Sequence, residues 1–162
     1  MLEENKIPST DRNTCNEKTV LASGVFDLLH LGHVKFLEEA KKAGGKNAKL
    51  VVIIARDSTV EGTKGRKPIM PENQRLALVK SLRVVDKAVL GFEEFDIGDV
   101  IQRIKPDVVA LGYDQTQMLT LVQEYVNKHK LKSKVVQIER FDADELDSSS
   151  KIKQRIVEKS ER

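Results

Sequence analysis

The chain has 162 residues, a length that suits one domain, and its single cysteine excludes an internal disulfide. Its 28 Lys and Arg residues against 25 Asp and Glu leave a net charge of +3, and aromatic residues make up 4% of the chain. The sequence therefore does not show the basic, aromatic-rich stripe typical of a nucleic-acid-binding domain, and we expect no nucleic-acid partner. The longest apolar run, "LVVIIA" at 50–55, is far shorter than the roughly 20 residues that cross a membrane, so we expect a soluble, cytoplasmic protein without a membrane partner.

Apolar segments alternate with amphipathic ones along most of the chain. Residues 1–18 are polar and lack the apolar stretch of a signal peptide, so we predict a disordered tail followed by a single domain over 19–162. The patterns predict strands at 19–26, 49–56, 86–91, 106–112 and 134–139, helices at 33–43, 71–82, 97–104, 118–129 and 148–159, and a polar loop at 57–70. This alternation predicts an α/β fold: a Rossmann-like, doubly wound, five-stranded parallel sheet with helices on both faces.

The loop after the first predicted strand holds two of the three histidines, in "GVFDLLHLGH" at 24–33. Ligands of doubly wound sheets bind beyond the carboxyl ends of the strands. His30 and His33 stand three positions apart where a helix begins, so both would project from one side of its first turn. A helix N-terminus favours anions, and two imidazoles would add hydrogen-bond donors. The alternatives are surface or capping histidines, or metal ligands, but no third ligand stands nearby. We therefore predict a phosphate site.

This stretch resembles the HxGH signature of the cytidylyltransferase-like nucleotidyltransferase superfamily. Further motifs follow in the order of that family: "KGRKPIMPENQR" at 64–75, "SLRVVDKAVLG" at 81–91, "PDVVALGYDQT" at 106–116 and "SSSKI" at 148–152. The resemblance implies that an acceptor phosphate attacks the α-phosphorus of ATP or CTP and that pyrophosphate leaves. It also implies Mg²⁺ or another divalent cation with the nucleotide, and no tightly bound organic cofactor.

The resemblance also implies roles for individual residues. It assigns catalytic roles to His30, His33 and Lys64, with the strongest transition-state role for His33, and it assigns no metal ligand. The nucleotide-binding residues that it implies are Gly24, Val25, Phe26, His30, Leu31, Gly32, His33, Arg83, Asp114, Phe141, Ser148, Ser149 and Ser150. Contacts from Asp27, Arg66, Lys67, Arg75 and Arg140 form a second group of predictions.

Some of these residues have ordinary structural alternatives. Asp27 either orients its loop, assists a metal or caps locally. Arg75 is otherwise a surface charge of its helix, and Arg83 is otherwise a salt-bridge partner of Asp86. The "KGRK" segment is either a solvated loop or a lid that closes over the triphosphate. Gly32 is expected to let the nucleotide lie close to the backbone, and helix capping explains one of the three serines but not all.

The choice of acceptor depends on local features. The segments "ARDSTVEGTKGRKPIMPENQR" and "LGYDQT" are most similar to archaeal-type FAD synthases, which implies ATP and FMN as substrates and FAD and pyrophosphate as products. The chain departs from that family in having "FDADELDSSS" where members carry cysteines. The alternatives are heptose 1-phosphate, glycerol 3-phosphate or phosphoethanolamine as acceptor, or a non-catalytic nucleotide-binding protein. Related enzymes also suggest a homodimer.

Overall fold

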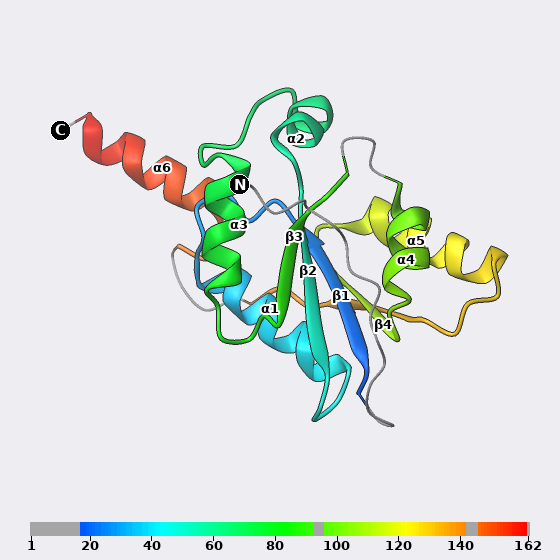
Figure 1. Ribbon diagram of the computed structural model, residues 1–162. Helices are drawn as coiled ribbons and strands as arrows, with labels where there is room; N and C mark the ends of the chain where they lie inside the picture. The colour runs from blue at the N-terminus through cyan, green and yellow to red at the C-terminus, as the bar shows by residue number, and fades with distance from the viewer. Residues whose placement is uncertain (1–16, 93–95, 142–145, 162) are drawn as a thin grey trace, which may run out of the picture.

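The computed structural model describes residues 17–92, 96–141 and 146–161, which form an α/β fold around one sheet (Figure 1). The strands are β1 (Thr19–Gly24), β2 (Lys49–Ile54), β3 (Lys87–Leu90), β4 (Val108–Gly112) and β5 (Lys134–Ile138). The helices are α1 (Leu31–Ala43), α2 (Asp57–Lys64), α3 (Glu72–Lys80), α4 (Ile97–Ile104), α5 (Thr116–Lys128) and α6 (Ser149–Ser160). All five predicted strands and all five predicted helices are confirmed, with bounds that shift by no more than two residues.

None of the described helices has the length and apolar character of a membrane span. Only residues 17 and 18 of the predicted tail are described, so its disorder stays a prediction.

The strands are all parallel and lie in the order β3-β2-β1-β4-β5, which confirms the predicted doubly wound sheet. The chain adds β2 and β3 on one side of β1, then crosses to the other side to add β4 and β5. The order therefore reverses between β1 and β4, and ligands of such sheets bind at this switch point. Both strands end there in glycine, at Gly24 and Gly112.

Alternate residues of the central strands face two helix layers. Leu50, Val52 and Ile54 of β2 belong to one buried cluster with side chains of α1 and α3. Val51 and Ile53 belong to a second cluster with side chains of α4 and α5, and Figure 1 shows the two helix pairs on opposite sides of the sheet. Because both faces of β2 are covered, its sequence is a continuous apolar run rather than an alternating one.

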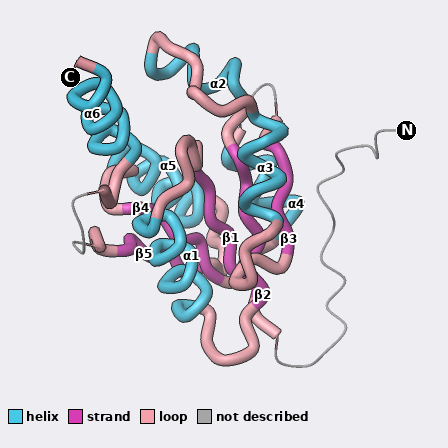
Figure 2. Tube along the Cα trace, turned by 90° about the vertical axis from the view of Figure 1, so that its left-hand side faces the viewer, coloured by secondary structure: helices cyan, strands magenta, loops and turns pink. Residues whose placement is uncertain are grey.

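The predicted loop over 57–70 is wrong in its first half, because Asp57–Lys64 forms α2. Gly62 and the β-branched residues around it lower the intrinsic helix propensity, and eight residues are too few for a helix to be stable by itself. Val60 is buried, so tertiary packing supplies the stability that the local sequence lacks. Gly65 ends the helix with a φ of 67°, a left-handed conformation that suits glycine. Figure 2 shows α2 standing apart from α6 at one end of the molecule.

Candidate active site

The loop after β1 bends sharply before α1 begins. Phe26 and Leu28 have φ angles of 54° and 49°, a left-handed region that side-chain-bearing residues rarely adopt. A Cβ at Gly24 would lie 2.9 Å from Cε2 of Phe26, so glycine is needed for that ring to fold back. The Phe26 ring is buried in the core. Its side chain therefore anchors the loop, and the backbone of the loop is the part that it can present to a ligand.

The two histidines of the loop lie against each other. His30 is the N-cap of α1 and His33 lies in its first turn. Their ring centroids are 3.8 Å apart and the rings are stacked, which confirms that they share one side of the helix. The backbone N–H of His30 donates to Nδ1 of His33 over a long 3.4 Å. In the neutral ring this leaves the proton of His33 on Nε2, which can donate to a ligand.

Both imidazoles are held in their neutral form. Burial, together with the nearby His30, lowers the pKa of His33 to about 3, against an opposing effect of Asp27. Burial also lowers the pKa of His30, although Asp147 acts in the other direction. A nearby negative charge favours the protonated form of an imidazole. Anion binding would therefore raise both pKa values and strengthen the hydrogen bonds of these rings to the anion.

The N-terminus of α6 lies directly beside that of α1. A Cβ at Gly32 would stand 2.5 Å from the backbone oxygen of Asp147, the residue before the α6 N-cap Ser148. The close neighbour of Gly32 in the structure is thus the protein backbone, whereas the sequence interpretation expected a nucleotide there. Each helix N-terminus carries a partial positive charge, so two of them side by side favour an anion.

The three serines have three different surroundings. Ser148 caps α6 by accepting a hydrogen bond from the N–H of Lys151 at 3.3 Å. Ser149 donates to the backbone oxygen of Asp27 and so ties α6 to residues 25–30, the loop between β1 and α1 that we call the histidine loop. Ser150 is exposed in the first turn of the helix. Capping explains one serine, as expected, and Ser150 is the one whose side chain faces solvent.

Asp27 orients the segments around the histidine loop. Its carboxylate accepts the N–H groups of Ile69 at 3.1 Å and Met70 at 3.0 Å, and the Lys153 ammonium lies 3.0 Å away. Burial would raise the pKa of Asp27, but these donors outweigh it and the pKa lies below its usual value. Of the three alternatives for Asp27, these contacts fit loop orientation. Sequence reasoning missed Lys153, although it lies four residues after Ser149 and so on the same helix face.

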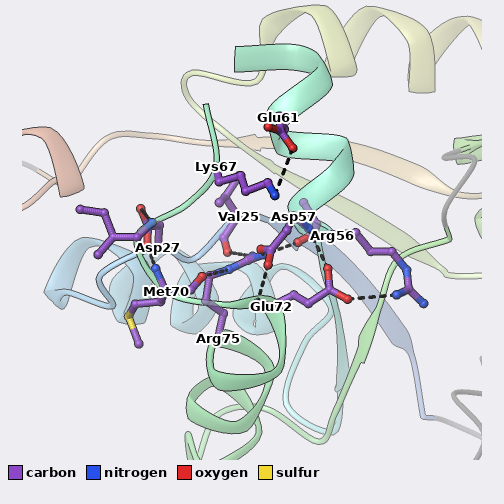
Figure 3. Close-up of polar contacts among 11 residues, drawn as sticks. Val25, Asp27, Arg56, Asp57, Glu61, Lys67, Met70, Glu72 and Arg75 are labelled. Atoms are coloured by element: carbon purple, nitrogen blue, oxygen red, sulfur yellow. Dashed lines mark hydrogen bonds and ion pairs between the residues drawn. The ribbon is translucent and has the colours of Figure 1, made fainter. Parts of the chain in front are cut away.

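Arg75 is fully buried, so its interpretation as a surface charge is wrong. Its guanidinium donates to the backbone oxygens of Met70 at 2.9 Å, Ala55 at 2.8 Å and Val25, and it pairs with Asp57 at 2.7 Å (Figure 3). Val25 follows β1 and Ala55 follows β2. Arg75 therefore supports the loops of the site from inside the protein.

The basic cluster after β2 is exposed. Lys64 is the last residue of α2, and Arg66 follows the glycine that ends it. Lys67 lies 3.7 Å from Glu61 in an exposed ion pair. Within the described part of the chain, Lys64 and Arg66 form no such pair. Their charges face solvent on a segment that follows the carboxyl end of β2.

Arg83 is not brought to this end of the sheet. It lies between α3 and β3, and hence at the amino ends of the parallel strands, so the structure does not support its predicted contact with a nucleotide. The alternative pairing is also wrong, because Asp86 pairs with Lys41 at 2.6 Å among the described side chains and accepts the N–H of Leu50. The motif order of the sequence does not reveal which edge a residue occupies.

The loop after β4 completes the switch point. Asp114 is exposed there, one residue beyond Tyr113. Gln115, which sequence reasoning missed, accepts the N–H of Gly112 at 2.7 Å and donates to the oxygen of Ser23 at 3.2 Å. It therefore bridges the ends of β4 and β1. The feature of the sequence that could have identified Gln115 is its place just after a predicted strand that ends in glycine.

The remaining predicted residues surround this edge. Leu31, at the first position of α1, is exposed. Arg140 lies over the ring of Tyr113 at 5.6 Å and 3.4 Å from Asp147. Phe141 is exposed, with the Lys35 ammonium 5.8 Å from its ring centroid. Residues 142–145 of the same segment lie outside the described part of the structure.

Comparison with known proteins identifies the family of this fold and site. Residues 21–155 match the family model described as Cytidylyltransferase-like, a span that contains both the histidine loop and the serines. The chain belongs to the cytidylyltransferase-like family. This cytidylyltransferase-like chain is similar to a relative named FAD synthase from Methanobrevibacter smithii, with 50% identity over 139 residues, 86% of this chain and 90% of the relative. It is also similar to the FAD synthase of Ferroglobus placidus, with 51% identity over 140 residues, 86% of this chain and 88% of that one.

Solved structures share the fold of this cytidylyltransferase-like chain. The lipopolysaccharide core biosynthesis protein from Thermoplasma volcanium has 46% sequence identity and a TM-score of 0.69, over 77% of this chain and 98% of its own. Pantothenate synthetase from Thermus thermophilus has 17% identity and a TM-score of 0.56, over 76% of this chain and 56% of its own, and shares the fold alone.

Proposed function

We propose that this chain is an FAD synthase, which transfers AMP from ATP to the phosphate of FMN and releases pyrophosphate. FAD synthases about half identical to it over most of their length support the acceptor. The observation that carries the proposal is the stacked pair of His30 and His33 at the N-terminus of α1, next to the N-terminus of α6. Neutral imidazole donors and two positive helix ends form a site for a polyphosphate.

The reaction proceeds by direct displacement at the α-phosphorus. An oxygen of the FMN phosphate forms a bond to the α-phosphorus of ATP, while the bond to the oxygen that bridges to the β-phosphorus breaks. Pyrophosphate leaves with that electron pair. The second pKa of a phosphate monoester is near 6, so the attacking group is already ionised and needs no strong general base. Catalysis then consists of alignment and charge stabilisation.

Different residues of the site align the substrates and stabilise the developing charge. The Nε2–H of His33 donates to the α-phosphate oxygens, with His30 stacked beside it. Ser150 and the N-terminus of α6 hold the departing phosphates. Lys64 adds positive charge from the exposed end of α2.

A divalent cation bound together with ATP would supply positive charge to the phosphates. Among the described residues no group of three His, Cys, Asp or Glu side chains could hold a metal ion. The carboxylate of Asp27 is already engaged by two backbone N–H groups and Lys153. The donor set thus suits a cation that ATP brings with its own phosphate oxygens. We also propose a cytoplasmic location. We further propose that the chain forms a homodimer, and sedimentation of the full chain tests that assembly.

A matrix of substrates tests the proposed function. ATP or CTP with Mg²⁺ is combined with FMN, heptose 1-phosphate, glycerol 3-phosphate or phosphoethanolamine, and both pyrophosphate and the product are measured. We expect FAD from ATP and FMN. Turnover of another acceptor without FAD formation would overturn the choice of FMN and retain the reaction class. Nucleotide binding without turnover of any pair would favour the non-catalytic alternative.

A further inference from the structure

A single buried guanidinium joins the histidine loop to both ends of the segment that carries Lys64. We call residues 57–70 the α2 flap, since they leave the sheet after β2 and return just before α3. At its first end Arg75 contacts the oxygen of Ala55 and the carboxylate of Asp57, and at its second end the oxygen of Met70 (Figure 3). The same guanidinium donates to the oxygen of Val25 in the histidine loop.

A second set of contacts fixes the first end of the α2 flap. The Asp57 N–H donates to Oε2 of Glu72 at 2.7 Å, and the Glu72 N–H donates to Oδ2 of Asp57 at 3.2 Å. Each carboxylate thereby caps the helix that begins with the other residue. Arg56 pairs with Glu72 at 3.0 Å and donates to the oxygen of Gly91 at 2.8 Å. Figure 3 shows Asp57 and Glu72 near Arg75, with the end of the Arg56 side chain on the far side of Glu72.

The remainder of the α2 flap has few constraints of its own. The buried residue of α2 is Val60, and a Cβ at Gly62 or Gly65 would meet nothing within 4 Å. Lys64 and Arg66 are exposed at its tip. A helix of eight residues is not stable by itself. The position of the basic tip therefore depends on the contacts at the two ends of the flap and on the packing of Val60 between them.

We infer that Arg75 is a positioning residue that sets where Lys64 and Arg66 lie relative to His33. The inference rests on the proposed function, which gives the basic tip its role at the triphosphate. Arg75 is fully buried and acts through the backbone and through Asp57. A lysine at this position retains the charge but lacks the planar fork, so one ammonium group cannot serve acceptors in three separate segments.

Limited digestion with trypsin tests the hold of Arg75 on the flap without reference to activity. Trypsin cleaves after Lys and Arg, and the flap offers the bonds after Lys64 and Arg66. In Arg75→Lys we expect cleavage at these two bonds to accelerate about tenfold relative to the other sites of the chain, as for loss of a local coupling. Acceleration at all sites together would show general destabilisation and overturn the inference.

Two further variants keep this test decisive. Asp57→Asn removes the negative charge that pairs with Arg75 and leaves the guanidinium in place, so it should also accelerate cleavage at the two flap bonds. It takes the place of Arg75→Lys if that variant does not fold. Arg103→Lys is the matched control. Arg103 is an exposed residue in the last turn of α4, over the ring of Phe92, and its substitution should leave the flap bonds unchanged.

A double-mutant cycle measures whether Arg75 acts through Lys64. The kcat/KM for ATP is compared in Arg75→Lys, Lys64→Ala and the double variant. If Arg75 positions Lys64, the loss caused by Arg75→Lys should shrink several-fold in the Lys64→Ala background. Fully additive losses would overturn the inference. Should the native protein form no FAD at all, the proposed function fails, and the tryptic pattern still decides the role of Arg75.

Discussion

Replacing Gly32 by alanine sets two effects of known sign against each other. Gly32 is the second residue of α1, and alanine is favoured over glycine in a helix by about 0.5–1 kcal/mol. The added Cβ, however, would stand 2.5 Å from the backbone oxygen of Asp147 and 3.0 Å from the His30 ring. Ordinary contact begins at 3.4 Å, so the N-termini of α1 and α6 must separate by nearly 1 Å.

The steric effect is the larger of the two. Forcing extra volume into a packed contact costs roughly 1–3 kcal/mol, and the helix propensity of alanine offsets part of that, so we expect a net loss of about 1–2 kcal/mol in the free energy of unfolding. The effect on the reaction is greater, because misplacing catalytic groups by about 1 Å can lower the rate by roughly 10²-fold. Activity should therefore fall much more than stability.

Thermal unfolding and steady-state FAD synthesis measure these two effects separately. For a domain of this size, the expected loss of stability lowers Tm by roughly 2–8 °C. Gly62→Ala is the matched control for stability, since its Cβ meets nothing within 4 Å and alanine should raise Tm by a few degrees. If Gly32→Ala retained the native kcat/KM, the close approach of α1 and α6 would not be needed to shape the site.

Other substitutions and pH test the remaining contacts. His33→Ala should lower kcat by roughly 10²–10³-fold, the scale for losing one donor to a developing charge, and an unchanged kcat would contradict its role. The pKa of His33 is about 3 in the folded protein against 6.5 as its ordinary value, so the unfolded chain binds more protons between these values. Tm should therefore fall as pH is lowered from 6.5 toward 3, and less steeply in His33→Ala; equal slopes would refute the shift. Asp27→Asn loses the ion pair with Lys153 and places an amide N–H group against the backbone N–H of Ile69 or Met70. A denaturant titration should show that the free energy of unfolding falls by about 1–3 kcal/mol.

Much of the fold and the centre of the site could be predicted because they depend on residues close together in the chain. The apolar run at 50–55 is typical of a strand covered on both faces, in which both sets of alternating side chains are buried. His30 and His33 stack because three positions along a helix bring side chains to one side. Ser148 caps its helix for the same kind of local reason.

Tertiary structure alone decided the contacts between distant segments. The burial of Arg75 depends on carbonyl groups after two different strands, and no periodicity in its own helix indicates them. Ser149 reaches Asp27 across 122 positions because α6 returns beside α1. Arg83 falls at the opposite end of the sheet since its place depends on strand direction. Hydrophobic periodicity reports which face of an element is buried, and only the packed fold determines which polar groups meet there.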